Sequence, residues 1–160
     1  MRKRLGFTLI ELLIVVTIVS ILAMAAFNTY QRSRWWSQVK LGREEVYRAL
    51  LEARTAAQRF NMKGVVKTTT PRTLRLVLYD KGKPFRSQDY TLTPGTILER
   101  WHNKKWVDPT GFEITYLPPY AETDADPVLF RVRLVHNPAY RLCLSVFGVT
   151  GKVVKTNVCP

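Results

Sequence analysis

The sequence contains few of the residues from which active sites are built. Its two histidines, His102 and His136, lie far apart and have no acidic residue placed to pair with them. The glycines are scattered, so no glycine-rich loop for a phosphate group is present. The adjacent acids Glu44 and Glu45 do not share a helix face, which argues against an acid–base pair. We therefore expect no catalytic residue and no enzyme activity.

Ligands for a metal ion are also scarce. The one acidic cluster, Glu122, Asp124 and Asp126, offers the oxygen atoms that hard cations prefer. It lacks the glycine and the distal glutamate of an EF-hand loop. We expect a solvated acidic loop, with no metal and no cofactor.

Only two cysteines are present, Cys143 and Cys159, within the last eighteen residues. A structural zinc site needs more ligands, and a redox-active pair needs closer spacing. If the domain lies outside the cytoplasm, we expect one disulfide between them. Closing a loop of this length stabilises the fold by about 3 kcal/mol in the chain-entropy model.

Acidic residues are few in proportion to basic ones. The chain has 12 Asp and Glu against 25 Lys and Arg, a formal charge of +13. Residues 28–160 alone carry 22 basic and 11 acidic residues, a charge of +11. Such a surface attracts phosphate groups or anionic lipids. Alternatively, the excess of basic residues serves solubility or reflects a thermophilic composition.

The one long apolar run lies at the N-terminus. Residues 7–27 contain a single charged residue, Glu11, and follow the basic Arg2, Lys3 and Arg4. A helix of this length spans about 30 Å, the thickness of the hydrocarbon core of a membrane, and the basic start favours a cytoplasmic N-terminus. A secretory signal peptide is the competing interpretation. The acid inside the run and the helical pattern that continues beyond it argue against a signal peptide.

A carboxylate in lipid costs about 2.5–3.5 kcal/mol, so Glu11 needs a functional explanation. If the chain were cut after Gly6, the new ammonium group of Phe7 could pair with Glu11 of a neighbouring copy. The segment LGFTLIELLIVVTIVSILAMAAF (5–27) resembles the class III leader and N-terminal helix of type IV pilins and pseudopilins. This resemblance implies cleavage between Gly6 and Phe7 by a prepilin peptidase, N-methylation of Phe7, and registration of filament subunits by Glu11. An ordinary signal anchor with a stray acid is the alternative.

Helical periodicity continues beyond this segment. Apolar or small residues recur at helical spacing on one face: Val39, Gly42, Val46, Leu50, Ala53, Ala57 and Phe60. The pattern predicts one helix over residues 8–61, apolar all round in its first half and amphipathic in its second. Gly64 is expected to form its C-cap. Trp35 and Trp36 fit either an interfacial aromatic anchor or packing against the following domain.

From Val65 onward the pattern changes to period two, with turn residues between the runs. About seven strands are expected, at residues 73–79, 85–92, 96–101, 112–116, 128–135, 140–147 and 152–158. With no second helix in the pattern, we predict an α+β fold in which the long N-terminal helix packs on antiparallel sheets, as in pilins. The expected parts are a leader (1–6), a transmembrane and filament-core helix (7–27) and a globular domain (28–160).

Two further segments narrow the resemblance. YRALLEARTAAQRFNMKGVVKT (47–68) and RLCLSVFGVTGKVVK (141–155) resemble the pseudopilin domain of the GspH/FimT type. In FimT-type minor pilins a Gly-Arg-x-Arg motif of the last hairpin contributes to DNA binding. In this chain the matching stretch has lysines, and its spacing is one residue longer. The candidate DNA-binding residues are Lys152, Lys155, Arg141, Arg131, Arg133, Lys104 and Lys105, of which the last two lie beside Trp101 and Trp106.

The predicted function is that of a minor type IV pilin, either a filament subunit or an initiator of assembly, with a role in DNA uptake for natural transformation, motility or adhesion. A GspH-like pseudopilin of a type II secretion system is the alternative, and a signal-anchored periplasmic enzyme is a third. The expected partners are the prepilin peptidase, other pilin subunits, the inner-membrane assembly platform, the membrane itself and DNA. We expect a single-pass inner-membrane protein with a periplasmic domain, which later joins a filament at the cell surface.

Overall fold

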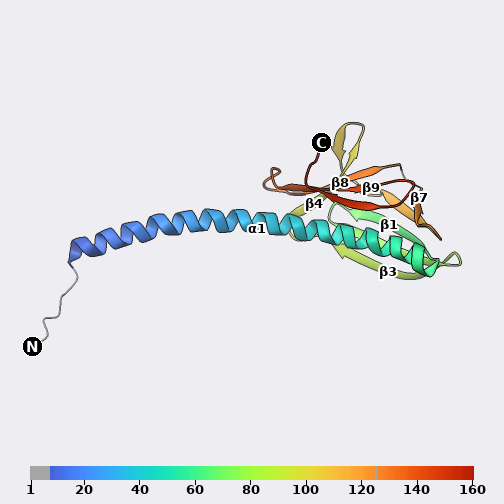
Figure 1. Ribbon diagram of the computed structural model, residues 1–160, viewed down its shortest axis with the longest axis horizontal. Helices are drawn as coiled ribbons and strands as arrows, with labels where there is room; N and C mark the ends of the chain where they lie inside the picture. The colour runs from blue at the N-terminus through green and yellow to red at the C-terminus, as the bar shows by residue number, and fades with distance from the viewer. Residues whose placement is uncertain (1–7, 125) are drawn as a thin grey trace, which may run out of the picture. The chain divides into compact units, whose positions relative to one another are not determined.

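The computed structural model describes residues 8–124 and 126–160. The leader, with the Gly6–Phe7 cleavage site, lies outside this part of the chain. The described residues form one long helix and ten strands, coloured along the chain in Figure 1. The chain divides into two compact units, of which the first ends at Trp35 and the second comprises Trp36–Pro160.

Helix α1 (Leu9–Phe60) confirms the single helix predicted from the sequence. Its part in the first unit exposes every large apolar side chain from Leu9 to Phe27, with exposed fractions between 49% and 79%. By length and composition α1 is able to cross a membrane. Among the described residues of this unit, no second element covers these side chains, so lipid or other helices must cover them in the cell.

The part of α1 in the second unit is amphipathic and packs on the strands, which it crosses in Figure 1. Its buried residues are Val39, Gly42, Val46, Ala49, Leu50, Ala53, Ala56 and Ala57. The prediction that Phe60 belongs to this face is wrong, because its side chain is 66% exposed. Phe60 is the last residue of α1 and lines an open apolar groove with Leu51, Leu78 and Phe85. Trp36 packs edge-on against Tyr140, with ring centres 5.1 Å apart, so for Trp36 the packing alternative holds.

The helix ends differently from the prediction. Asn61, with φ at 55°, has the left-handed conformation that follows many helices, and Gly64 already lies inside the first strand. A Cβ atom at Gly64 would lie 2.8 Å from the carbonyl oxygen of Ala53. Gly64 is therefore a point of close helix–strand contact and not the C-cap.

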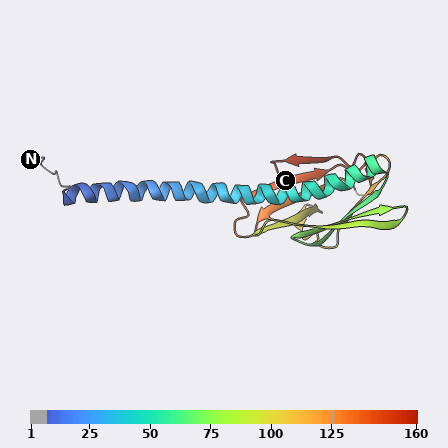
Figure 2. The ribbon, with the colours of Figure 1, turned by 90° about the horizontal axis from the view of Figure 1, so that it is seen from below.

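The ten strands form two five-stranded sheets in which every pairing is antiparallel. The first sheet has the order β3-β2-β1-β6-β7 and the second has the order β10-β9-β8-β4-β5. Their bounds are β1 (Lys63–Thr70), β2 (Thr73–Asp80), β3 (Lys83–Thr91), β4 (Thr96–His102), β5 (Lys105–Val107), β6 (Glu113–Leu117), β7 (Glu122–Thr123), β8 (Val128–Leu134), β9 (Arg141–Val146) and β10 (Val153–Thr156). Figure 2 shows the same sheets and α1 from a second direction. The α+β fold is thus as predicted.

Three of these strands were not predicted. Strands β5 and β7 have three and two residues, too few to display an alternating pattern. Strand β1 alternates in burial, but its inward residues are Gly64, Val66 and Thr68, of which only Val66 is a large apolar residue. The seven predicted strands correspond to the remaining elements.

The core lies between α1 and the inward faces of the two sheets. The largest fully buried side chains include Tyr116 of β6, Phe130 of β8 and Leu50 of α1. Both sheets contact the same helix: Gly42 lies against Thr96 and Val132 of the second sheet, and Ala53 lies against Gly64 of the first. The opposite face of the second sheet therefore points away from α1.

Candidate assembly site and basic sheet face

The first candidate site is the start of α1, where Thr8 and Glu11 bond to each other. The Thr8 backbone N–H donates to Glu11 Oε2 at 2.9 Å, and the Thr8 hydroxyl donates to the same oxygen at 2.8 Å. The Glu11 backbone N–H in turn lies 3.3 Å from Thr8 Oγ1. This reciprocal pattern is a capping box, which satisfies backbone groups that the first helical turn leaves without partners.

The capping box gives Glu11 a defined place. Its carboxylate lies at the N-terminal end of the helix, where the helix dipole favours negative charge. Residue 7, the proposed new N-terminus, immediately precedes this cap. Thr8 was not predicted as the local partner of Glu11, although the sequence contains the Thr-x-x-Glu spacing that marks a capping box.

The second candidate site is the outward face of the second sheet, here called the basic sheet face. Along β8, Phe130, Val132 and Leu134 point into the core, while Arg131 and Arg133 alternate with them and point outward. Strand register places Arg131 beside Glu99 of β4, and Arg133 beside Arg141 of β9. The basic sheet face comprises Glu99, Trp101, Trp106, Arg131, Arg133 and Arg141, with Lys104 in the turn beyond the tryptophans.

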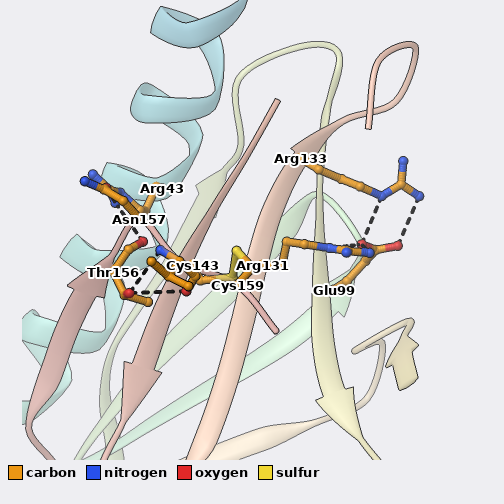
Figure 3. The surroundings of a disulfide bond; sticks show 9 residues. Arg43, Glu99, Arg131, Arg133, Cys143, Thr156, Asn157 and Cys159 are labelled. Atoms are coloured by element: carbon orange, nitrogen blue, oxygen red, sulfur yellow. Dashed lines mark hydrogen bonds and ion pairs between the residues drawn. A yellow bond between two sulfur atoms is a disulfide. The ribbon is translucent and has the colours of Figure 1, made fainter. Parts of the chain in front are cut away.

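Glu99 links the two arginines of β8, as Figure 3 shows. Its Oε2 accepts from Arg131 Nη2 at 2.5 Å and from Arg133 Nε at 2.9 Å, and its Oε1 accepts from Arg133 Nη2 at 3.0 Å. Burial raises the pKa of Glu99, but the hydrogen bonds from Arg133 and Arg131 outweigh it and leave that pKa below its ordinary value. The carboxylate is therefore charged at neutral pH, and one acid serves two guanidinium groups.

Two tryptophans extend this cluster toward the edge of the sheet. Trp101 of β4 and Trp106 of β5 are cross-strand partners, with ring centres 5.0 Å apart and planes inclined by 59°. The guanidinium of Arg131 lies 4.2 Å from the centre of the Trp106 ring, a cation–π contact. Arg131 thus connects Glu99 to the tryptophan pair.

The predicted DNA-binding residues fall into two groups. Lys104 is exposed in the turn of the β4–β5 hairpin, and Arg141 is exposed on β9 beside Arg133, so these two belong with Arg131 and Arg133 to the basic sheet face. Lys105 is exposed at the start of β5, but its cross-strand partner is His102, which places it on the sheet face opposite Trp101 and Trp106. Lys152 is exposed in the turn before β10. Lys155 instead points toward α1, where its ammonium lies 2.6 Å from a Glu44 carboxylate oxygen and 4.0 Å from the Tyr47 ring centre. The structure therefore separates Lys155 from the arginines of β8.

The expected disulfide joins Cys143 of β9 to Cys159, with 5.7 Å between their Cα atoms. Cys143 is fully buried, so the cross-link ties the C-terminal tail onto the second sheet. The same tail is held from α1, since Arg43 donates to the Thr156 carbonyl and to the Asn157 side chain (Figure 3). The strand register places Cys143 beside Arg131. The tail thus borders the basic sheet face on its β9 side.

The acidic loop does not form a metal site within the part of the chain described. Among those residues there is no group of three His, Cys, Asp or Glu side chains that could hold an ion. Asp124 is used structurally, because its Oδ1 accepts from the Thr115 backbone N–H at 3.0 Å.

The N-terminal segment and the fold of the domain each resemble those of known proteins. Residues 1–27 match the family described as the prokaryotic N-terminal methylation motif. None of the curated proteins matches the sequence. The motif implies processing by a prepilin peptidase and assembly with other pilin-type subunits.

Solved structures resemble the domain at low sequence identity. Two structures of EpsH, the minor pseudopilin of the Vibrio cholerae type II secretion system, match at 14% identity with TM-scores of 0.57 and 0.58. They cover 75% and 78% of this chain and 97% and 96% of theirs. The type IV minor pilin FimU of Pseudomonas aeruginosa matches at 12% identity with a TM-score of 0.52, covering 79% of this chain and 90% of its own.

The apolar helix, the motif and the fold together fit a subunit anchored in the inner membrane with its domain in the periplasm. The chain therefore carries the N-terminal methylation motif of prepilins on a domain with the fold of the minor pilins and pseudopilins.

Proposed function

We propose that this chain is a minor subunit of a type IV pilus, a structural protein that is cut between Gly6 and Phe7 and then joins the filament. The observation that carries the proposal is the start of α1. There, Glu11 is held by Thr8 at the head of a helix whose large apolar side chains from Leu9 to Phe27 are all exposed. In a filament these side chains become buried against other helices.

Glu11 acts in filament assembly through its negative charge. Lipid or packed helices exclude water, so the Glu11 carboxylate gains most from a partner of opposite charge. The methylated amino group of Phe7 in a neighbouring subunit supplies that charge. Pairing of the two groups fixes the axial position of one subunit against the next.

The proposed role of the filament is DNA uptake. The domain over residues 28–160 carries a charge of +11, and the basic sheet face gathers four basic residues around one acid. Such a surface binds phosphates with an affinity that falls steeply between about 50 and 200 mM salt. The assembly platform of the inner membrane is the further partner this role needs.

The experiment begins with the processed chain. When the protein is expressed in a pilus-forming host, we expect it in sheared filaments. Its measured mass is expected to be that of a mature chain that starts at N-methylated Phe7. The purified full chain is expected to retard DNA at low salt. A mature N-terminus elsewhere would contradict the processing step, and no retardation of any DNA at low salt would contradict the uptake role.

A second candidate is a pseudopilin of a type II secretion system. The observation that favours it is the likeness of the fold to EpsH, a minor pseudopilin of such a system. A deletion strain separates the two candidates when it is scored separately for piliation, transformation and protein secretion. Loss of secretion with normal transformation would favour the pseudopilin.

A further inference from the structure

The basic sheet face keeps two like charges side by side. Arg133 and Arg141 are direct cross-strand partners, an arrangement that destabilises a sheet unless an anion lies nearby. The one acid of this face, Glu99, already accepts from Arg131 and Arg133. Among the described residues no acidic side chain pairs with the exposed Arg141. An anion from outside the chain would relieve this repulsion.

The same face carries a fixed aromatic surface. Trp106 contacts both the Arg131 guanidinium and the Trp101 ring, and both tryptophans are only partly buried. Arg131 is itself held by Glu99. The pair of rings is therefore held in place before any ligand arrives, which lowers the entropic cost of binding.

Position decides which anion fits. Lys104 lies beyond the tryptophans at the hairpin tip. Arg141 lies toward the opposite end of the face, because Arg141 and Ile97 are both cross-strand partners of Arg133, and Ile97 lies near the start of β4. Cations at both ends of an aromatic surface match a chain of phosphates that carries flat rings between them. Bases can stack on tryptophan only when they are unpaired, because in a duplex their faces are covered.

We propose that the basic sheet face binds single-stranded DNA, with an unpaired base stacked on Trp101 and the backbone phosphates at Lys104 and Arg141. This inference rests on the DNA-uptake role proposed above and assigns it to one strand of DNA and to one face of the domain. Arg131, Arg133 and Glu99 position the tryptophans and do not contact the bases.

The test measures fluorescence anisotropy of a labelled oligothymidylate with the full chain in detergent micelles at about 50 mM salt. Trp101→Leu removes the ring, and we expect single-strand affinity to fall at least about fivefold while duplex affinity stays unchanged. Trp101→Phe keeps an aromatic ring and is expected to retain most of the affinity. Thermal unfolding checks that each variant is folded.

Lysine variants on two different hairpins are compared, one as the test and one as its charge-matched control. Lys104→Gln is expected to weaken binding and to reduce the slope of log affinity against log salt by about 0.7, the contribution of one phosphate contact for single strands. Lys81→Gln removes the same charge from the exposed β2–β3 turn, where Lys81 is left-handed like Lys104. This control is expected to match the parent chain.

The outcomes separate the two proposals. Parent-like single-strand binding by the Trp101→Leu chain and by the Lys104→Gln chain would overturn the assigned face while DNA binding itself stands. Equal loss of duplex and single-strand affinity in Trp101→Leu would overturn the stacking of an unpaired base. Failure of the parent chain to bind either DNA would instead remove the uptake role on which the inference rests.

Discussion

Gly64 of β1 lies directly against Ala53 of α1, so closely that a Cβ atom on Gly64 would stand 2.8 Å from the Ala53 carbonyl oxygen and 2.9 Å from its Cα. Both obstructing atoms belong to the helix backbone and cannot rotate away. The contact fixes the distance between the end of α1 and the first sheet.

Gly64→Ala is therefore expected to destabilise the domain by about 1–3 kcal/mol, because helix and strand must separate to admit the methyl group. Urea unfolding of the full chain in detergent measures the change. Lys67→Ala, on the same strand but exposed, is expected to alter stability by less than about 0.5 kcal/mol. Equal stability of the Gly64→Ala and parent chains would contradict the close packing.

The Cys143–Cys159 disulfide closes a loop of sequence separation 16 and holds the C-terminal tail on β9. Its reduction is expected to lower the free energy of unfolding by about 3 kcal/mol, because the unfolded chain regains conformational freedom. Urea unfolding with and without reductant measures this difference. A double variant, Cys143→Ala with Cys159→Ala, is expected to start at the lower stability and to ignore the reductant.

Because of Glu99, the free energy of unfolding of the domain is expected to depend on pH in the acid range. Since its pKa in the folded chain lies below the ordinary value, its pairing with the arginines is fully present above the ordinary pKa of a glutamate, about 4.3, and is lost as the pH falls through the folded pKa. Glu99→Gln is expected to cost about 2 kcal/mol near neutral pH and progressively less in acid.

Urea midpoints of parent and Glu99→Gln chains at neutral pH and in acid test this dependence. Glu113→Gln, which removes an exposed acid of β6, serves as the control with a small effect at both pH values. A difference between parent and Glu99→Gln chains that does not shrink in acid would contradict the assignment.

The capping box makes a separate prediction for Thr8. Thr8→Val keeps the branched shape but removes the hydroxyl that bonds to Glu11, at a cost of about 1 kcal/mol to the first turn. We expect less of this chain in sheared filaments, while Thr8→Ser is expected to behave as the parent. Parent-like incorporation of Thr8→Val would show that the cap has no part in assembly.

Much of the fold could be predicted from the sequence because its signals are local. The apolar run and the three- and four-residue spacing beyond it fixed the extent of α1. Strand β8 could be predicted because its apolar residues Phe130, Val132 and Leu134 alternate with charged residues. Gly64 was misassigned because a glycine near a helix end has the same appearance whether it caps the helix or admits a neighbouring backbone.

The residues of the two candidate sites also differ in how well the sequence predicts their roles. Glu11 could be found because a lone acid in an apolar run is conspicuous in sequence. The role of Glu99 could not, because it depends on which strands are neighbours: Glu99 and Arg131 are 32 residues apart and meet only through the pairing of β4 with β8. The orientation of Lys155 toward Glu44 likewise depends on which face of β10 meets the helix.

The most direct test of the central claim is the amount of Glu11→Gln chain in sheared filaments, compared with that of the parent and of Glu45→Gln as a control on the same helix. The Glu11→Gln side chain keeps the size of the parent and loses only the charge that pairs with methylated Phe7. We predict normal processing at Phe7 and a strong loss of Glu11→Gln from filaments, with Glu45→Gln unchanged. Incorporation of a processed Glu11→Gln chain at the level of the parent would contradict the account.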